Sequence, residues 1–286
     1  MRYIRAIVGA AFAAAAVTAL AACQSAAGST ASSPTASPIG TDQATGAGAG
    51  TAWTYTMASP TDDESPRDTL AVEYPVVAYA KATTASTALA ASVNTKLKNV
   101  DEAFVSQFRS QFINPVPVTV DGKVVPSKLM VTAQANQSGE LLSVRYDAFL
   151  DRSGSAGGYT EEQALTVRMD TGATLGPSDL LTADALTASG RTTLAGLIAP
   201  ALGGDFIFGG QSAAGAVAGA LATMGTPVNG LTDPVVSVTR TGLEFTFQQG
   251  AITPMSDGTP SATIPFGKLT GLINPRVTAL LGPVSG

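Results

Sequence analysis

The sequence predicts an α+β fold, in which a mainly antiparallel sheet packs against a long amphipathic helix and a shorter helix lies near the C-terminus. The long helix is predicted by residues 84–113, which contain neither Gly nor Pro and carry apolar side chains at spacings of three and four. The sheet is predicted by short runs rich in β-branched and aromatic residues on both sides of that segment, separated by Gly-containing turns. With 286 residues, of which 45% are hydrophobic, the chain is long enough to bury a core.

Residues 1–22 have the organisation of a lipoprotein signal peptide. Arg2 and Arg5 are followed by an apolar run, residues 7–20, that is shorter than the roughly 20 residues of a transmembrane helix. The sequence Leu20-Ala21-Ala22-Cys23 resembles a lipobox, in which the thiol becomes diacylglyceryl-modified and the peptide is cleaved just before it. We therefore expect Cys23 to be lipidated and to anchor the protein at the extracytoplasmic face of the cell membrane, by two or three acyl chains. The alternative is an ordinary secretory cleavage site.

Residues 23–50 are predicted to form a disordered tether. After Cys23 they consist mainly of Ser, Thr, Ala, Gly and Pro, and Asp42 is their only charged residue. Such a segment buries too little apolar surface to offset the entropy cost of ordering. The folded domain is therefore expected over residues 51–286.

The domain is expected to begin with strands and the long helix. Residues 51–58 alternate in polarity, and residues 68–80 are rich in β-branched and aromatic residues but interrupted by Pro75, which indicates two strands or one edge strand with a bulge. The helix over residues 84–113 is expected to pack on the sheet, with a partner-binding helix as the alternative. Its predicted apolar stripe consists of Leu89, Val93, Leu97, Val100, Phe104, Phe108 and Phe112.

The next segments indicate an antiparallel meander. Residues 116–120 and 129–135 flank a turn at Asp121-Gly122, and residues 141–151 and 159–170 are joined by a Gly-rich loop. Ser178 or Thr182 is expected to cap a helix running towards Ile198. Residues 203–234 contain a candidate small-residue helix. Two strands around a turn at 241–242, a strand at 261–266 and a short helix at 268–281 close the domain.

Several of these pieces, in this order, resemble the RsiV-like extracellular domain over about residues 68–281. "RTGLEFTFQQGAITPMSDGTPSATIPFGKLTGLI" (240–273) resembles the closing pattern of the family, and "MDTGATLGPSDLL" (169–181) resembles its strand, Thr-Gly turn and helix start. "LSVRYDAFLDRSGSAGGYT" (142–160) resembles its central hairpin, and Tyr74-Pro75 followed by a helix with Asn94 resembles its opening.

The resemblance implies an antiparallel sheet packed on a long helix, and it implies no catalytic residues. The family occurs in a lysozyme-sensing anti-sigma factor, beside some peptidoglycan deacetylase domains and in secreted actinobacterial antigens. Here Tyr159 stands where relatives often have a histidine, and the segment 203–234 is longer than the family pattern. Because we expect neither an anti-sigma nor a deacetylase domain in this chain, neither activity is carried over.

The composition argues against several functions. The chain has no histidine and a single cysteine, so His-dependent catalysis, His-containing zinc sites and internal disulfides are excluded. Ser212 lies in a segment that superficially resembles a nucleophile elbow but has no histidine to act as base. A formal charge of −5 and the lack of a basic run argue against nucleic acid and favour a basic protein partner. No cofactor and no metal are expected.

The candidate binding residues surround the central loop: Tyr159, Asp147, Asp151, Glu161 and Glu162. We expect a non-catalytic binding module whose ligand is a cell-wall-active protein such as lysozyme. The alternatives are a structural envelope lipoprotein with no soluble ligand, and a hydrolase of peptidoglycan or glycan that uses two carboxylates. Another group of acidic residues is Asp62-Asp63-Glu64. None of the acidic groups in the sequence has the residue spacing of a calcium-binding loop. A binder should expose an apolar or aromatic patch near the loop, whereas a glycosidase should bring two carboxylates together in one cleft.

Overall fold

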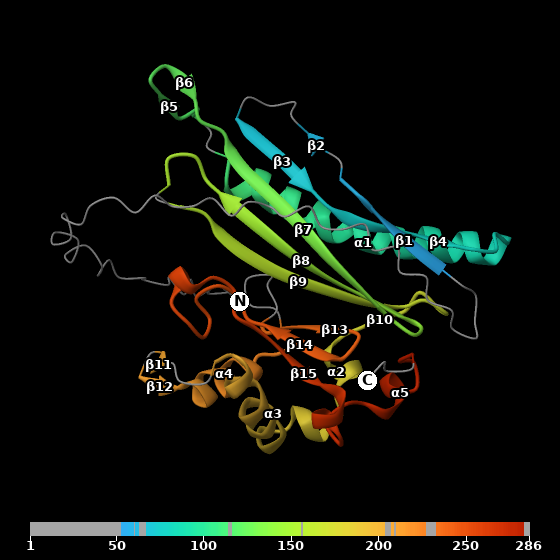
Figure 1. The fold of residues 1–286 in the computed structure, drawn as a ribbon. Coiled ribbons are helices and arrows are strands. Elements are labelled where there is room, and N and C mark those ends of the chain that lie inside the picture. The colour runs from blue at the N-terminus through green and yellow to red at the C-terminus, as the bar shows by residue number, and fades with distance from the viewer. Residues whose placement is uncertain are drawn as a thin grey trace, which may run out of the picture. The chain divides into compact units, whose positions relative to one another are not determined.

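The computed structural model describes residues 53–59, 61–62, 67–113, 116–155, 157–203, 207–208, 210–226 and 233–282. The predicted signal peptide, Cys23 and the tether lie outside these residues. The described residues all belong to one compact unit, and they form an α+β fold, as the sequence predicts (Figure 1).

A six-stranded sheet with strand order β10-β9-β8-β7-β3-β2 forms the centre of the fold. Its long strands β7 (Ser127–Ser138), β8 (Leu141–Asp151) and β9 (Tyr159–Arg168) pair antiparallel in chain order. The predicted meander is confirmed for these three strands, whereas the predicted strand at 116–120 is not part of it, because residues 119–120 pair with 123–124 in a separate hairpin. The remaining strands are β2 (Thr61–Asp62), β3 (Asp68–Val72) and β10 (Thr174–Leu175). β3 pairs parallel with β7, because the helix between them carries the chain back to the same end of the sheet.

The long helix α1 (Thr84–Gln111) runs across one face of this sheet (Figure 1). Thr83 starts it with a capping box, in which the Thr83 and Ser86 side chains each accept a hydrogen bond from the other residue's backbone N–H. The predicted helix at 84–113 is confirmed within two residues of its end. Its buried apolar side chains pack against the odd-numbered residues of β7 and the even-numbered residues of β8, which point to the same face.

Two strands pair beside this layer, β1 (Trp53–Ala58) and β4 (Tyr74–Tyr79). The segment 68–80 therefore forms two strands, β3 and β4, with a break at Glu73. The side-chain amide of Asn94 on α1 binds the backbone of β4: Val77 N donates to Asn94 Oδ1 at 2.7 Å, and Asn94 Nδ2 donates to Val77 O at 3.0 Å. This pair of hydrogen bonds joins the helix to the strand.

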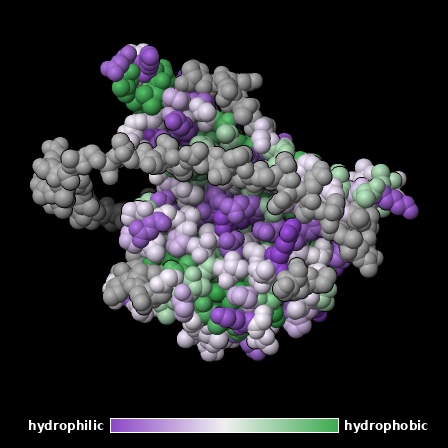
Figure 2. Space-filling model, in the orientation of Figure 1, coloured by the Kyte–Doolittle hydropathy of each residue, from purple (hydrophilic) through white to green (hydrophobic). Residues whose placement is uncertain are grey.

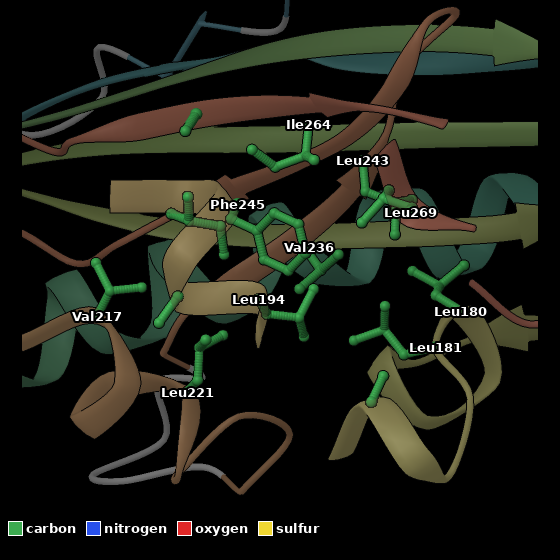
Figure 3. Packing of buried hydrophobic residues seen from close by; sticks show 14 of the residues in the cluster. Leu180, Leu181, Leu194, Val217, Leu221, Val236, Leu243, Phe245, Ile264 and Leu269 are labelled. Carbon is green, nitrogen blue, oxygen red and sulfur yellow. The ribbon is translucent and has the colours of Figure 1, made fainter. Parts of the chain in front are cut away.

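A second layer consists of a three-stranded antiparallel sheet and several short helices. Its strands are β13 (Val235–Val238), β14 (Gly242–Thr246) and β15 (Ser261–Pro265), and its helices are α2 (Pro177–Leu180), η1 (Asp184–Leu186), α3 (Ala188–Ala201), α4 (Ala213–Leu221), η2 (Met255–Asp257), η3 (Phe266–Leu269) and α5 (Pro275–Thr278). Leu194, Val217 and Leu221 from the helices meet Phe245 and Ile264 from the sheet in its core (Figure 3). Two small hairpins complete the fold: β5 (Thr119–Val120) with β6 (Lys123–Val124), and β11 (Ile207–Phe208) with β12 (Gln211–Ser212).

The sequence predictions for this layer need three corrections. The helix that runs through Ile198 is capped by Thr187, whose hydroxyl accepts from Gly190 N, and the Thr182 hydroxyl accepts from Ala185 N at the start of η1 instead. The candidate small-residue helix is present as α4, shorter than the segment. The helix expected at 268–281 is divided into η3 and α5, because Gly271 has a φ of 80° and Pro275 starts a new helix.

Candidate functional site

The five candidate binding residues lie on β8, on β9 and at the ends of these strands, but they do not form one site. Glu162 pairs in register with Asp147, whereas Glu161 pairs with Ala148 and Tyr159 with Leu150. Since successive side chains on a strand point to opposite faces, Glu161 and Glu162 are separated by the sheet. Asp147 and Glu162 face the second layer, and Glu161 and Tyr159 face α1.

On the face towards the second layer, three carboxyl groups surround one guanidinium; we call Arg145, Asp147, Glu162 and Glu244 the Arg145 cluster. Arg145 Nε lies 3.0 Å from Asp147 Oδ1 and 3.8 Å from Glu162 Oε2, and Arg145 Nη1 lies 2.7 Å from Glu244 Oε1. Because Glu244 belongs to β14, Arg145 joins the two sheets. Neither Arg145 nor Glu244 is among the residues predicted from the sequence, although an arginine two residues before Asp147 on one strand must share its face.

Burial sets the protonation of this cluster. It raises the pKa of Glu162 far above its usual range, and a hydrogen bond with Asp147 adds to the rise and outweighs the opposing charge of Arg145. Glu162 is therefore protonated at neutral pH. For Arg145, burial opposes the charged form, but Asp147, Glu244 and Glu162 together raise the pKa of the guanidinium.

The geometry of Asp147 and Glu162 is not that of a glycosidase. The Asp147 carboxyl is close enough to Glu162 to raise its pKa, and both groups lie at the Arg145 guanidinium, whereas the catalytic pair of a glycosidase stands about 5 to 9 Å apart to flank the scissile bond. Glu162 is further fixed through its backbone. Its N–H donates to Gln248 Oε1 at 2.9 Å, and its carbonyl accepts from Gln248 Nε2 at 2.7 Å.

On the opposite face, Glu161 holds Tyr159 and α1 together. Tyr159 OH donates to Glu161 Oε1 at 2.6 Å, and Gln107 Nε2 donates to both carboxylate oxygens, at 2.8 and 2.9 Å. The Tyr159 ring packs on Phe112, with ring centroids 5.5 Å apart. Glu161 is buried, so it has a structural role, and Tyr159 is half-buried.

Asp151, the remaining candidate binding residue, lies next to the loop that follows β8. It is half-buried at the last position of the strand, and Ser155 Oγ donates to its Oδ1 at 3.4 Å. Of the other acidic group, Asp62 lies in β2, while Asp63 and Glu64 fall outside the described residues.

Apolar side chains are exposed at the end of the sheet where this loop lies. Met130 on β7 and Phe149 on β8 pair in register and are 49% and 37% exposed. Val116, which is 74% exposed, precedes the β5–β6 hairpin, and Val120 and Val124 are exposed within it. We call these five residues the apolar end. Figure 2 shows hydrophobic surface at the hairpin.

The loop between β8 and β9 packs closely against the residues of the apolar end and its hairpin. A Cβ atom on Gly158 would lie 2.5 Å from Phe149 Cζ, so only glycine leaves room for the ring where it lies. Gly154 lies next to Val118 at the base of the hairpin. At the tip of the hairpin, Asp121 and Gly122 have φ values of 50° and 76°, which a tight two-residue turn requires. The sequence predicts an apolar or aromatic patch near the loop that precedes Tyr159, but none of the five residues of the apolar end.

Neither a metal site nor a membrane span is found in the described part of the chain. Its acidic side chains form no group of three or more that could hold a metal ion. None of its helices is both long enough and apolar enough to cross a bilayer.

Among known proteins, the comparisons find similarity to solved structures. No family model matches the chain, and no curated protein does. Two similar solved structures are a DUF3298 family protein from Pseudomonas aeruginosa PAO1 (TM-score 0.46, 14% identity) and a DUF3298 family member from Bacteroides fragilis NCTC 9343 (TM-score 0.48, 16% identity). Each match covers 80% of this chain and 96% of the other. The protein is thus similar in structure to DUF3298 proteins, the RsiV-like domain, over 80% of its length.

Proposed function

We propose that this protein is a lipid-anchored lipoprotein of the cell envelope whose folded domain binds another protein without catalysing a reaction. The observation that carries the binding function is the apolar end. The proposed anchor rests on Cys23 and the lipobox-like residues before it.

The apolar end has the character of an interface. Monomeric soluble proteins rarely expose clustered large apolar side chains unless a partner covers them. Phe149 supplies an aromatic anchor of the kind that dominates binding energy at interfaces, and Met130 next to it can adapt its shape to a partner. The valines of the β5–β6 hairpin are exposed and contribute little to the core.

The carboxyl groups of the β8–β9 hairpin support binding over hydrolysis. Asp147 and Glu162 both pair with the Arg145 guanidinium, and the Glu161 carboxylate accepts hydrogen bonds from Tyr159 and Gln107. Attack of a carboxylate or an activated water on a glycosidic bond needs two separated groups with free access. These residues therefore serve the scaffold on which the apolar end is presented.

Lysozyme is the first ligand to test. Residues 68–281 resemble a domain family that includes a lysozyme-sensing protein. Lysozyme is also a basic enzyme, and a chain with a formal charge of −5 attracts a basic partner. Of the predicted contact residues, Asp147 and Asp151 lie nearest to Phe149 along the chain, each two residues away.

The test is a calorimetric titration of the full-length protein, held in detergent, with lysozyme at low and at physiological salt. We expect saturable binding with a defined stoichiometry that weakens with salt. Phe149→Ser should weaken it at least 10-fold, whereas Met255→Ser, a matched change at an exposed methionine on the second layer, should leave it unchanged. No binding at either salt would exclude lysozyme and favour the structural envelope lipoprotein.

A further inference from the structure

A groove of about 620 Å³ lies between α1 and the junction of β3 and β4, away from the apolar end. Its strand side is formed by Val72 and Tyr74. Its helix side includes Asp101, Val105 and Ser106. The groove thus combines two valines and an aromatic ring with two carboxyl groups, Asp101 and Glu102, and two basic side chains, Lys98 and Arg109.

Asp101 occupies a position where the helix otherwise buries apolar side chains. It follows Leu97 by four residues and precedes Phe104 by three, so it points with them towards the sheet. It is only 3% exposed. Asp68 and Glu162 each leave one buried oxygen without a hydrogen-bond partner among the described residues, whereas Asp101 leaves both of its oxygens without one.

The neighbouring donors are already engaged. Tyr146 OH donates to Leu97 O at 3.1 Å, and Lys98 Nζ pairs with Glu102 Oε1 at 2.8 Å. Arg109, which also lines the groove, lies two helical turns further, about 12 Å along the axis. A buried carboxylate without a partner is costly. Burial, and to a lesser extent the nearby Glu102, accordingly raises the pKa of Asp101 to about 7.

We infer that this groove binds a primary alkylammonium group, with the Asp101 carboxylate as its counter-ion and Val72, Val105 and Tyr74 around its apolar stem. The ammonium supplies the positive charge and the donors that the carboxylate lacks. The Tyr74 ring adds a face on which a cation is stabilised. Because both oxygens of Asp101 are covered, binding requires this side chain to turn towards the groove.

The lining favours an organic cation over a metal ion. Calcium takes six to eight oxygen ligands and magnesium needs a near-octahedral shell. Besides Asp101, the helix side of the groove offers the Ser106 and Ser110 hydroxyls and the Glu102 carboxylate, and Glu102 is already paired with Lys98. Two valines and a tyrosine ring match an alkyl chain instead. This inference goes beyond the proposed function and uses none of the residues of the apolar end.

The experiment is a titration of the ¹⁵N-labelled full-length protein with n-pentylamine, followed by NMR, with n-pentanol as the uncharged probe and CaCl₂ as the metal probe. We expect the amides of Val72, Tyr74, Val105 and Ser106 to shift and to saturate with pentylamine only. Asp101→Asn should weaken binding at least 10-fold. Asp257→Asn, the same change at an exposed site on the second layer, should have no effect.

A pH series on the unmodified protein tests the same inference without a variant. Pentylamine stays charged between pH 5.5 and 8.5, while Asp101 changes from protonated to ionised. Its affinity should therefore rise roughly 30-fold over this range, as the binding-competent fraction rises. Equal binding of pentylamine and pentanol, equal binding to Asp101→Asn, or saturation by CaCl₂ alone would overturn the inference. None of these results bears on the lysozyme titration.

Discussion

The side-chain amide of Asn94 on α1 makes two hydrogen bonds with the backbone of Val77 on β4. It thus occupies the place that a neighbouring strand would take. The amide of Asn94 donates to the carbonyl and accepts from the N–H of one residue of β4, as a paired strand would. Gln248 does the same for Glu162 on β9. Both pairs satisfy backbone groups at the edge of a strand, where they would otherwise be open to water or to another chain.

Asn94→Ala should destabilise the protein by about 2 kcal/mol, because it leaves two backbone groups of Val77 without partners. The free energy of unfolding in urea is the measurement. Thr95→Ala is the control, since its exposed hydroxyl bonds only to the carbonyl of Ala91 on its own helix. Equal stability of Asn94→Ala and Thr95→Ala would show that water replaces the amide without cost.

Gln248→Ala should open the edge of β9. β10 pairs with only two residues of β9, Thr166 and Val167, so the Gln248 amide covers a part of the strand that β10 does not reach. We expect a loss of about 1 to 2 kcal/mol in unfolding free energy and, because open strand edges pair with one another, concentration-dependent association in sedimentation velocity. Gln111→Ala, at the exposed end of α1, should remain unchanged in both measurements. A variant that loses stability but stays monomeric would contradict the role assigned to this edge.

Arg145→Gln should be strongly destabilising, by about 3 to 5 kcal/mol, because it leaves Asp147 and Glu244 at the sheet interface without their counter-ion. Arg168→Gln removes an ion pair of similar length, 2.6 Å to Asp170, but this pair is about one third exposed. Its loss should cost less than about 1 kcal/mol. Thermal unfolding of both variants compares the two sites, and similar melting temperatures would contradict the argument that burial makes the difference.

The stability of the protein should fall as pH rises from about 4 to about 7, and Asp101→Asn should remove the part of this fall that Asp101 causes. Burial of Asp101, with Glu102 adding to it, raises its pKa from 3.8 to about 7. Between these values the folded protein holds a proton that the unfolded chain has released, so a rise in pH favours unfolding. At pH 8 the variant should exceed the unmodified protein by up to about 4 kcal/mol, and the difference should shrink at pH 4. Denaturant midpoints at the two pH values measure this, and a constant difference would contradict it.

Cys23→Ser should release the protein from the membrane. Because Cys23 is the only cysteine, the substitution removes every site for a thioether lipid or a thioester. Incorporation of radiolabelled palmitate and fractionation of cells into membrane and aqueous parts are the measurements. Ser25→Ala should stay in the membrane fraction. Membrane retention of Cys23→Ser without palmitate incorporation would show that another feature holds the protein there.

Local patterns in the sequence predict much of the fold. The stripe from Leu89 to Phe112 predicts α1, and alternation predicts β7, β8 and β9. The parallel pairing of β3 with β7 could not be predicted in this way, because it depends on where a 28-residue helix returns the chain. The division of the C-terminal helix follows from Gly271 and Pro275, whose effect outweighs the apolar spacing around them.

The candidate site was harder to predict, because residue type alone does not give the face of a strand. Glu161 and Glu162 are adjacent in sequence, and only their period-two alternation places them on opposite sides of the sheet. The burial of Asp101 was not predicted, because a charged residue next to an apolar stripe is usually assigned to the solvent side of a helix. Val100, its neighbour, was predicted to be buried and is half-buried instead. The exposure of Phe149 depends on how far the second layer extends over the sheet.

Gly157 and Gly158 are chemically identical neighbours that tolerate different changes. A Cβ on Gly157 would meet no atom within 4 Å, whereas one on Gly158 would collide with the ring of Phe149 and with the carbonyl of Leu150. The shape of the surface around Phe149 thus depends on the absence of a side chain at Gly158. In a library of variants selected for ligand binding, position 157 should accept many residues and position 158 almost none. Sequence variation at this surface is therefore expected at Gly157 and not at Gly158.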